Sequence, residues 1–272
     1  MPELPDVEVF KRYLDAHALR QVISAVDVRE PRILDAITPR ALASRLRGRQ
    51  LTGSRRHGKH LLVALDRDGW LTLHFGMTGS LTWFTDPADD PPYDRLRFDF
   101  TGGAHLAYCS QRLLGRVGLA DDADGFLRSA GLGPDALDPA LDAARLGAML
   151  GGRRGGLKAA LMDQGLIAGI GNIYADEILF QARLHPNVRA AGLDAGAVER
   201  LYRSMREVLE TAIACGAGVE RFPERLPQGY LLRRRQAGAP CPRCGTATAT
   251  IKVAGRTTYL CPACQPAESP TA

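Results

Sequence analysis

The pattern of hydrophobic and polar residues divides the chain into a β-rich first half and a helical second half. Within residues 6–19, apolar side chains recur on one helical face, and two prolines precede them, where proline is tolerated. The following short apolar runs, bounded by Gly, Asp or Pro, predict strands at 60–65, 70–75, 80–84, 96–100 and 105–108. Asp68-Gly69 and Gly102-Gly103, in two of the gaps, are typical of hairpin turns. The first half is therefore predicted to be an antiparallel β-sandwich or barrel with a leading helix.

After residue 134 the spacing of apolar residues becomes helical. Helices are predicted at 140–150, 157–164, 173–182 and 195–215. Asn172 follows a glycine-rich turn and is a good N-cap for the third helix. Residues 216–238 are rich in Gly, Pro and Arg and are predicted to form a loop and linker. We expect an α+β multidomain protein with domains at 1–133, 134–235 and 236–272, the last a compact cysteine module.

Length and composition fit a folded protein in a reducing compartment. The chain has 272 residues, 45% of them hydrophobic, which is enough to bury a core and form more than one domain. This content is too high for intrinsic disorder. No run approaches 18 apolar residues, so no membrane partner is expected. The N-terminus carries acids and no apolar segment of a signal peptide, which predicts a cytoplasmic location.

The charge is unevenly distributed along the chain. The net charge is +5, and only four of the 35 basic residues are lysines. Residues 1–149 hold 19 bases and 20 acids, whereas residues 150–272 hold 16 bases and 10 acids. Arginine suits phosphate geometry, so nucleic acid is the leading partner. An arginine bias also accompanies GC-rich genomes, and composition alone does not separate the two explanations.

Four of the six cysteines form the strongest spacing signal. They make two CxxC pairs separated by 16 residues: Cys241, Cys244, Cys261 and Cys264. Two such pairs on facing hairpins supply the four thiolates of one tetrahedral structural zinc ion. A redox dithiol is the alternative, but one pair would suffice for it and no thioredoxin-like context surrounds either. Cys109 and Cys215 are expected to be core residues.

The segment between the two cysteine pairs, 246–259, alternates as a hairpin with Arg256 near its tip. An arginine on a zinc-bound hairpin is well suited to reach into a DNA groove. The other interpretation is an ordinary solvated turn.

The N-terminal Pro2-Glu3 pair is unusual as structure but is well suited to a chemical role. Methionine before proline is commonly removed, which leaves Pro2 as a secondary amine. An α-amino group has a pKa of roughly 8, against about 10.4 for lysine, so a useful neutral fraction exists at physiological pH. Such an amine can attack a sugar C1′ to give an iminium ion, and Glu3 can protonate the departing oxygen. Taken alone, the pair is more often a lead-in to a helix.

Five segments in order span nearly the whole chain. They are MPELPDVEV at the N-terminus, HFGMTGSL at 74–81, LMDQGLIAGIGNIYADEILF at 161–180, ARLHP at 182–186 and the terminal cysteine module. Together they resemble the formamidopyrimidine-DNA glycosylase and endonuclease VIII family. The resemblance implies a helix–two-turn–helix domain and a zinc finger. It also implies a monomeric base-excision-repair enzyme that flips an oxidised base from duplex DNA, excises it and cuts the strand by β,δ-elimination, with no small-molecule cofactor.

The resemblance also implies the roles of individual residues. Pro2 would be the Schiff-base nucleophile and Glu3 the acid. Lys59 would take part in β-elimination and Arg256 in δ-elimination. The residues implied to contact DNA are Met77, Tyr93, Arg112, Leu114, Arg153, Lys158 and Asn172. Those in the first half would fill the gap left by the flipped base or touch a phosphate, and the last three would hold the phosphates next to the lesion.

Several positions depart from the family pattern. Asp6 stands where the family usually has Glu. Residues 110–115 read Ser-Gln-Arg-Leu-Leu-Gly, so Leu114 replaces an aromatic wedge. Tyr93 replaces a histidine, and the region 216–230 is short and divergent. The catalytic positions are intact while the lesion-reading positions have changed, so the chemistry is better supported than the choice of substrate.

Three functions remain open on the sequence. The leading one is a glycosylase/AP lyase for oxidised purines, chiefly formamidopyrimidine, with 8-oxoguanine. The second is the same chemistry on oxidised pyrimidines, as in the endonuclease VIII branch. The third is a non-catalytic protein that binds damaged DNA, which would have no need for Pro2, Glu3 and Lys59 together.

Overall fold

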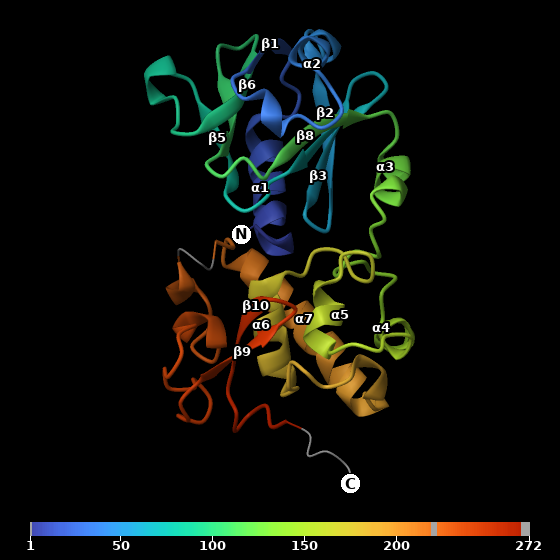
Figure 1. Cartoon of the computed structure of the whole chain (residues 1–272). Coiled ribbons are helices and arrows are strands. Elements are labelled where there is room, and N and C mark those ends of the chain that lie inside the picture. Colours follow the sequence, from blue (N-terminus) through green and yellow to red (C-terminus); the bar gives the residue numbers. More distant parts are fainter. Residues whose placement is uncertain (1, 219–221, 268–272) are drawn as a thin grey trace. The chain divides into compact units, whose positions relative to one another are not determined.

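Two four-stranded antiparallel sheets form the first unit of the chain, Met1–Gly131 (Figure 1). The computed structural model describes residues 2–218 and 222–267. One sheet has the strand order β1-β6-β7-β5 and the other β2-β3-β4-β8. The strands are β1 Ile23–Val28, β2 Leu51–His57, β3 His60–Leu65, β4 Trp70–His74, β5 Gly79–Phe84, β6 Asp94–Phe100, β7 His105–Ser110 and β8 Arg116–Ala120. The helices are α1 Leu4–His17, α2 Pro39–Leu46 and α3 Ala123–Ser129, with 3-10 turns η1 Pro31–Ile33 and η2 Pro87–Asp89.

Both sheets and two helices contribute to one hydrophobic core. Strand β6 alternates strictly, with Leu96, Phe98 and Phe100 buried and the residues between them half-buried. The same core contains Val63 of β3 and Leu14 of α1. Because alternate side chains of a strand point to opposite faces, this pattern gives each sheet one core face. The predicted β-sandwich with a leading helix is confirmed, and so are all five predicted strands.

Three strands escaped prediction. Strand β2 contains a glycine and two arginines, and it lies at the edge of its sheet. An edge strand with a partly solvated face needs no regular apolar pattern, and β1 and β8 are also edge strands. They are recognisable only through the partners with which they pair.

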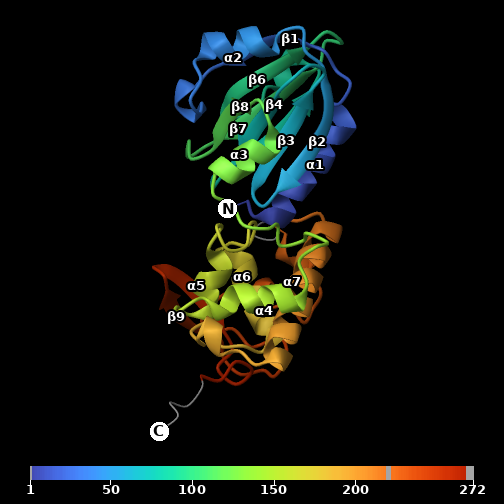
Figure 2. The ribbon, with the colours of Figure 1, turned by 90° about the vertical axis from the view of Figure 1, so that its right-hand side faces the viewer.

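The second unit, Leu132–Ala272, is helical and carries a terminal hairpin (Figure 2). Its helices are α4 Ala143–Gly151, α5 Leu157–Met162, α6 Asn172–Ala182 and α7 Ala195–Ala214, with turns η3 Ala190–Gly192, η4 Pro223–Arg225 and η5 Leu231–Arg234. Strands β9 Ala249–Val253 and β10 Arg256–Leu260 form the hairpin. Helix α6 is buried on all sides, including Asp176 and Glu177. A helix buried all round is the centre of its unit.

The expected linker at 216–238 is partly wrong. Tyr230, Leu231 and Leu232 are buried, and Glu177 of α6 accepts the backbone N–H groups of Leu231 (3.3 Å) and Leu232 (2.8 Å). A buried carboxylate needs such donors, and η5 supplies them from its N-terminal end. Residues 230–232 are therefore part of the core of the second unit, whereas 219–221 lie outside the described residues. Among the described helices, none is long and apolar enough to cross a membrane.

Two histidines lie at the base of the β2–β3 turn. His60 and His74 pair across β3 and β4 with ring centroids 4.8 Å apart, and Phe126 packs on His60 at 5.6 Å. Burial lowers the pKa of His60 to about 3, and the neighbouring His74, His57 and Lys59 lower it further. The ring is thus neutral in the folded protein at physiological pH.

At pH values below 6.5, we expect the chain to lose stability relative to the His60→Phe variant. Unfolded His60 binds a proton near pH 6.5 whereas the folded residue does not, so the loss reaches up to about 1.4 kcal/mol per pH unit. Phenylalanine preserves the ring packing without the titration. Urea unfolding of both chains between pH 4.5 and 7.5 measures this difference, and parallel stability curves would contradict it.

Candidate functional site

Strand register brings three loops of the first unit to one end. His60 pairs with His74, and His74 pairs with Arg116. In the other sheet Gly79 pairs with Ser110. The β2–β3 turn at 58–59, the loop at 75–78 and the loop at 111–115 therefore meet at the same end of the sandwich.

Helix α1 directs its N-terminus towards this end. Arg56 Nε, near the end of β2, donates to Glu8 Oε2 at 3.1 Å, and further along the helix Asp15 accepts a hydrogen bond from Ser54. Because α1 runs beside β2 in this direction, its first residues reach the β2–β3 turn. The structure thus brings the predicted residues Pro2, Glu3 and Lys59 to one end of the first unit.

Glu3 is the N-cap of α1 and is fully buried, whereas Pro2 is half-buried. The backbone N–H of Glu3 donates to Asp6 Oδ2 at 2.9 Å. The unusual Asp6 is thus a capping residue that fixes the backbone of Glu3, and its shorter side chain still reaches. Lys59 follows Gly58, which has a positive φ of 55°, and Gly58 O accepts Arg56 Nη1 at 3.4 Å. The backbone that carries Glu3 and the backbone that carries Lys59 are therefore both fixed by hydrogen bonds.

The two remaining loops at this end pack backbone against backbone. Gly76 has a φ of +57°, and a Cβ there would lie 2.4 Å from Leu114 C. The Arg112 N–H donates to Thr78 Oγ1 at 3.0 Å. Leu114 is 46% exposed, and Met77 is half-buried. The predicted Met77, Arg112 and Leu114 therefore belong to one joined pair of loops with an exposed apolar tip.

Tyr93 occupies a left-handed backbone conformation at the same end, with a φ of +63°, and is 50% exposed. Its carbonyl accepts the N–H of Ser110 at 3.0 Å, and the Arg95 guanidinium lies 5.6 Å from its ring centroid. Next to it, burial raises the pKa of Asp94 to about 6, while Arg29 at 3.1 Å acts in the opposite direction. Surrounding contacts thus hold an exposed aromatic ring in a strained turn.

Asn172 does not cap α6 as predicted. Gly171 is the N-cap, and Asn172 is the first residue of the helix. Its side chain is engaged elsewhere: Oδ1 accepts Lys158 Nζ at 2.7 Å, and Nδ2 donates to Thr257 O at 3.2 Å. The glycine supplies the extended backbone that precedes the helix, which frees the asparagine side chain to reach the hairpin.

Lys158 is fully buried, which the sequence did not indicate. Its Nζ lies 2.7 Å from Thr258 Oγ1 and 2.7 Å from Asp176 Oδ1, in addition to Asn172. Arg235 Nη2 lies 2.9 Å from the other oxygen of Asp176. The group predicted to hold a phosphate lies at the centre of an internal charge network in the structure.

Arg153 and Arg256 are accessible. The Arg153 side chain is 42% exposed, and its Nη1 lies 3.0 Å from Asp163 Oδ2. Arg256 is exposed and opens β10, opposite Val253 and directly after the turn of Ala254 and Gly255, both of which have positive φ. The predicted hairpin places this arginine at its tip.

The four cysteines of the terminal module converge. Their Sγ atoms all lie within 4.8 Å of one another, with Cys244–Cys261 at 3.5 Å and Cys241–Cys264 at 3.9 Å. Four thiolates around one zinc at 2.3 Å are about 3.8 Å apart, so the donor set fits a tetrahedral ion. Of the two other cysteines, Cys109 is buried as expected, but Cys215 is only half-buried at the end of α7.

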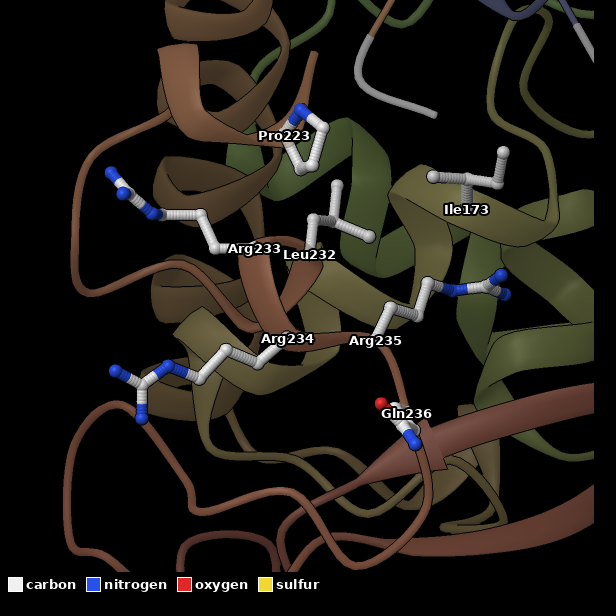
Figure 3. A pocket seen from close by; sticks show the side chains of 7 residues that line it. All are labelled: Ile173, Pro223, Leu232, Arg233, Arg234, Arg235 and Gln236. Carbon is white, nitrogen blue, oxygen red and sulfur yellow. The ribbon is translucent and has the colours of Figure 1, made fainter. Parts of the chain in front are cut away.

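A pocket of about 380 Å³ opens beside the start of α6 (Figure 3). It is lined by Ile173, Pro223, Leu232, Arg233, Arg234, Arg235 and Gln236. Arg235 extends to the side of Ile173, and Arg233 and Arg234 extend to the opposite side.

Sequence reasoning missed Asp176, Glu177 and Arg235. The signal was present as two adjacent acids in an otherwise apolar helix, which must be buried and so must have partners. The identity of those partners, an upstream lysine and the backbone of a segment more than 50 residues away, lay beyond any local pattern.

Comparisons with known proteins find matches to one family in three successive parts of the chain. Three family models match: the N-terminal domain of formamidopyrimidine-DNA glycosylase at residues 1–117, its H2TH domain at 132–224 and a zinc finger found in FPG and IleRS at 238–267. The chain is 39% identical to the formamidopyrimidine-DNA glycosylase of Thermomicrobium roseum, over 98% of this chain and 99% of that protein. It is 41% identical to that of Moorella thermoacetica, over 90% and 92% respectively.

Solved structures with the same fold contain DNA. Lactococcus lactis Fpg bound non-covalently to DNA with an AP site has a TM-score of 0.88 and 31% identity, over 97% of this chain and all of that one. A MutM complex with DNA containing carbocyclic 8-oxo-G has a TM-score of 0.89 and 31% identity, over 98% of this chain and all of that one. With the zinc-finger match and the clustered thiolates, the prediction of one structural zinc ion is confirmed.

Gly76→Ala is expected to destabilise the loop pair by about 2 kcal/mol, because the new Cβ must displace the backbone of residues 114–115. Gly103→Ala is the matched control, since Gly103 also has a positive φ (81°) but no atom lies within 4 Å of its Cβ position. Urea unfolding compares the two. Equal losses of stability would show that backbone strain alone is responsible.

Cys261→Ser is expected to reduce bound zinc from one ion per chain to almost none and to remove amide-exchange protection from the hairpin strands β9 and β10. A structural zinc contributes folding free energy directly, so losing one ligand should release the hairpin. Metal analysis and hydrogen exchange measure both effects, with Cys215→Ser as control. Retained protection in zinc-free protein would contradict the structural role.

Proposed function

The chain belongs to the formamidopyrimidine-DNA glycosylase family, and from this premise we propose that it excises oxidised bases, chiefly oxidised purines, from duplex DNA and then cuts the abasic strand. The observation that carries the proposal is the end of the first unit, where Pro2, buried Glu3 and Lys59 lie with the paired loops. A DNA-binding protein without catalysis would need the loops but not this chemistry.

Pro2 supplies the nucleophile in this proposal. Its nitrogen attacks C1′ of the damaged nucleotide, the C1′–N bond breaks, and the electron pair leaves with the base. The Pro2 nitrogen gives up its proton to the departing base and then forms a double bond to C1′ as the C1′–O4′ bond breaks, and Glu3 donates the proton that O4′ requires. The iminium formed at C1′ is an electron sink for the later steps. A fixed backbone at Glu3 keeps acid and nucleophile adjacent, which reduces the entropy cost of reaction.

Lys59 and Arg256 serve strand cleavage. Loss of the C2′ proton expels the 3′ phosphate, and a second elimination expels the 5′ phosphate. We assign Lys59 to the first elimination and Arg256 to the second. Each is a cation at a tight turn, suited to a phosphate leaving group.

The joined loops enter the DNA duplex at the site of the flipped base. Met77 and Leu114 fill the space left by the flipped base, and Arg112 faces the orphaned partner base. Leu114 is exposed and rests on a tightly packed backbone, so it keeps the apolar character of a wedge without an aromatic ring. Tyr93, Arg153 and Asn172 contact backbone phosphates.

The proposed partner is double-stranded damaged DNA, bound by a monomer that carries zinc and no small-molecule cofactor. Cytoplasmic action on chromosomal DNA follows from this activity. We retain the division into domains 1–133, 134–235 and 236–272, with the zinc finger as the last, as part of the proposal.

We expect the chain to form a covalent adduct with DNA when borohydride is added to duplexes that carry formamidopyrimidine, 8-oxoguanine or an abasic site. Peptide mapping should locate the adduct at the N-terminus, and Pro2→Gly should reduce its yield at least tenfold because the secondary amine is lost. Glu3→Gln is the matched control: it should still trap abasic DNA but not the oxidised bases.

The same experiment separates the alternatives. Adducts with thymine glycol and dihydrouracil but not with oxidised purines would favour the pyrimidine activity. Normal binding with no adduct on any duplex would overturn the enzymatic proposal.

A further inference from the structure

Three oxygen atoms surround the ammonium group of Lys158 at the same distance. Asn172 Oδ1, Thr258 Oγ1 and Asp176 Oδ1 each lie 2.7 Å from Nζ. They come from the start of α6, from β10 and from the second turn of α6. Lys158 has no exposed surface, so the group is enclosed rather than presented to solvent.

This arrangement determines how the Asn172 amide is oriented. An ammonium group only donates hydrogen bonds, so the atom of Asn172 that faces it must be the oxygen. The NH2 group is then on the other side, where one of its two protons is donated to Thr257 O at 3.2 Å. Asn172 itself is half-buried. Its second N–H is left to point away from Lys158.

Resting on the proposed function, we infer that Lys158 is a positioning residue: its ammonium holds the Asn172 amide with the NH2 group turned towards a DNA phosphate and does not itself bind that phosphate. Asn172 then acts as a neutral donor of fixed orientation.

The surrounding charges make a direct phosphate contact by Lys158 costly. Asp176 is also fully buried, and its second oxygen accepts Arg235 Nη2 at 2.9 Å and the Tyr259 N–H at 3.2 Å. Moving the Lys158 ammonium to a phosphate would strip a buried carboxylate of one partner, which is strongly unfavourable. The network also joins α5, α6, Arg235 just after η5, and β10, so it fixes Asn172 relative to the hairpin.

Salt dependence distinguishes positioning from direct contact. Each phosphate contact by a cation contributes about 0.9 to the slope of log affinity against log salt, whereas a neutral amide contributes nothing. We expect Lys158→Met to weaken binding of a duplex with a tetrahydrofuran abasic-site analogue about tenfold, as Asn172→Ala does, with an unchanged slope. Arg153→Met, which removes an exposed cation, is the matched control and should reduce the slope by about 0.9.

The double variant Lys158→Met/Asn172→Ala should bind no more weakly than either single variant. A reduced slope in Lys158→Met, or additive losses, would overturn the inference.

Asn172→Asp tests the same point if Lys158→Met fails to fold. A carboxylate still accepts from Lys158 but loses both donations of the NH2 group, including the one to Thr257 O, so the chain should stay folded with a somewhat lower thermal midpoint while affinity falls at least as far as in Asn172→Ala. Binding like that of the unmodified chain would overturn the inference.

Nitrogen-15 spectra of the unmodified chain provide a measurement without any lysine variant. On adding the duplex, the side-chain amide signal of Asn172, assigned by its loss in Asn172→Asp, should shift while the Lys158 ammonium signal stays. The reverse result would make Lys158 the ligand. All these readouts measure binding, so absence of a borohydride adduct would overturn the proposed activity and leave the inference standing.

Discussion

The second unit depends on the burial of two adjacent acids in one helix. Asp176 and Glu177 lie on different faces of α6, so their donors come from different directions. Glu177 binds the N-terminal backbone of η5, and Asp176 binds Lys158, Arg235 and the backbone of β10. Because a buried carboxylate without donors is far more costly than any single contact, these requirements hold the surrounding elements in register. The zinc hairpin is attached to the same helix, where Arg243 stacks on Phe180 with 4.4 Å between guanidinium and ring centroid.

In the first unit, the β-sandwich must hold the candidate catalytic residues in fixed positions. Its reactive positions lie at the start of α1 and in turns at one end of the sheets, and contacts with neighbouring residues fix each of them. Arg56 links the β2–β3 turn to α1, Asp6 fixes the backbone of Glu3, and Gly76 allows two loops to touch through their main chains. Loops on a rigid scaffold can carry function because their anchors, rather than their own hydrogen bonds, limit their motion.

Prediction from sequence succeeded where the signal is local. Alternation located the central strands, helical spacing located α4 to α7, and cysteine spacing located the zinc site. It failed at β2, whose polar edge position carries no alternation, and at 216–238, where polar composition concealed a buried anchor segment. The prediction that Asn172 caps α6 was wrong, because the glycine before it does the capping.

What the sequence by itself determined is the central strands and the main helices, the zinc ligands and the candidates for chemistry, since periodicity, ligand spacing and residue type are properties of short segments. Only the tertiary structure decided which cations are available. Arg153 and Arg256 are accessible while Lys158 is enclosed, although all three carry the same charge in the sequence. The physical reason is that accessibility depends on which acids are buried nearby, and Asp176 draws Lys158 inward across 18 residues of chain that no local pattern connects.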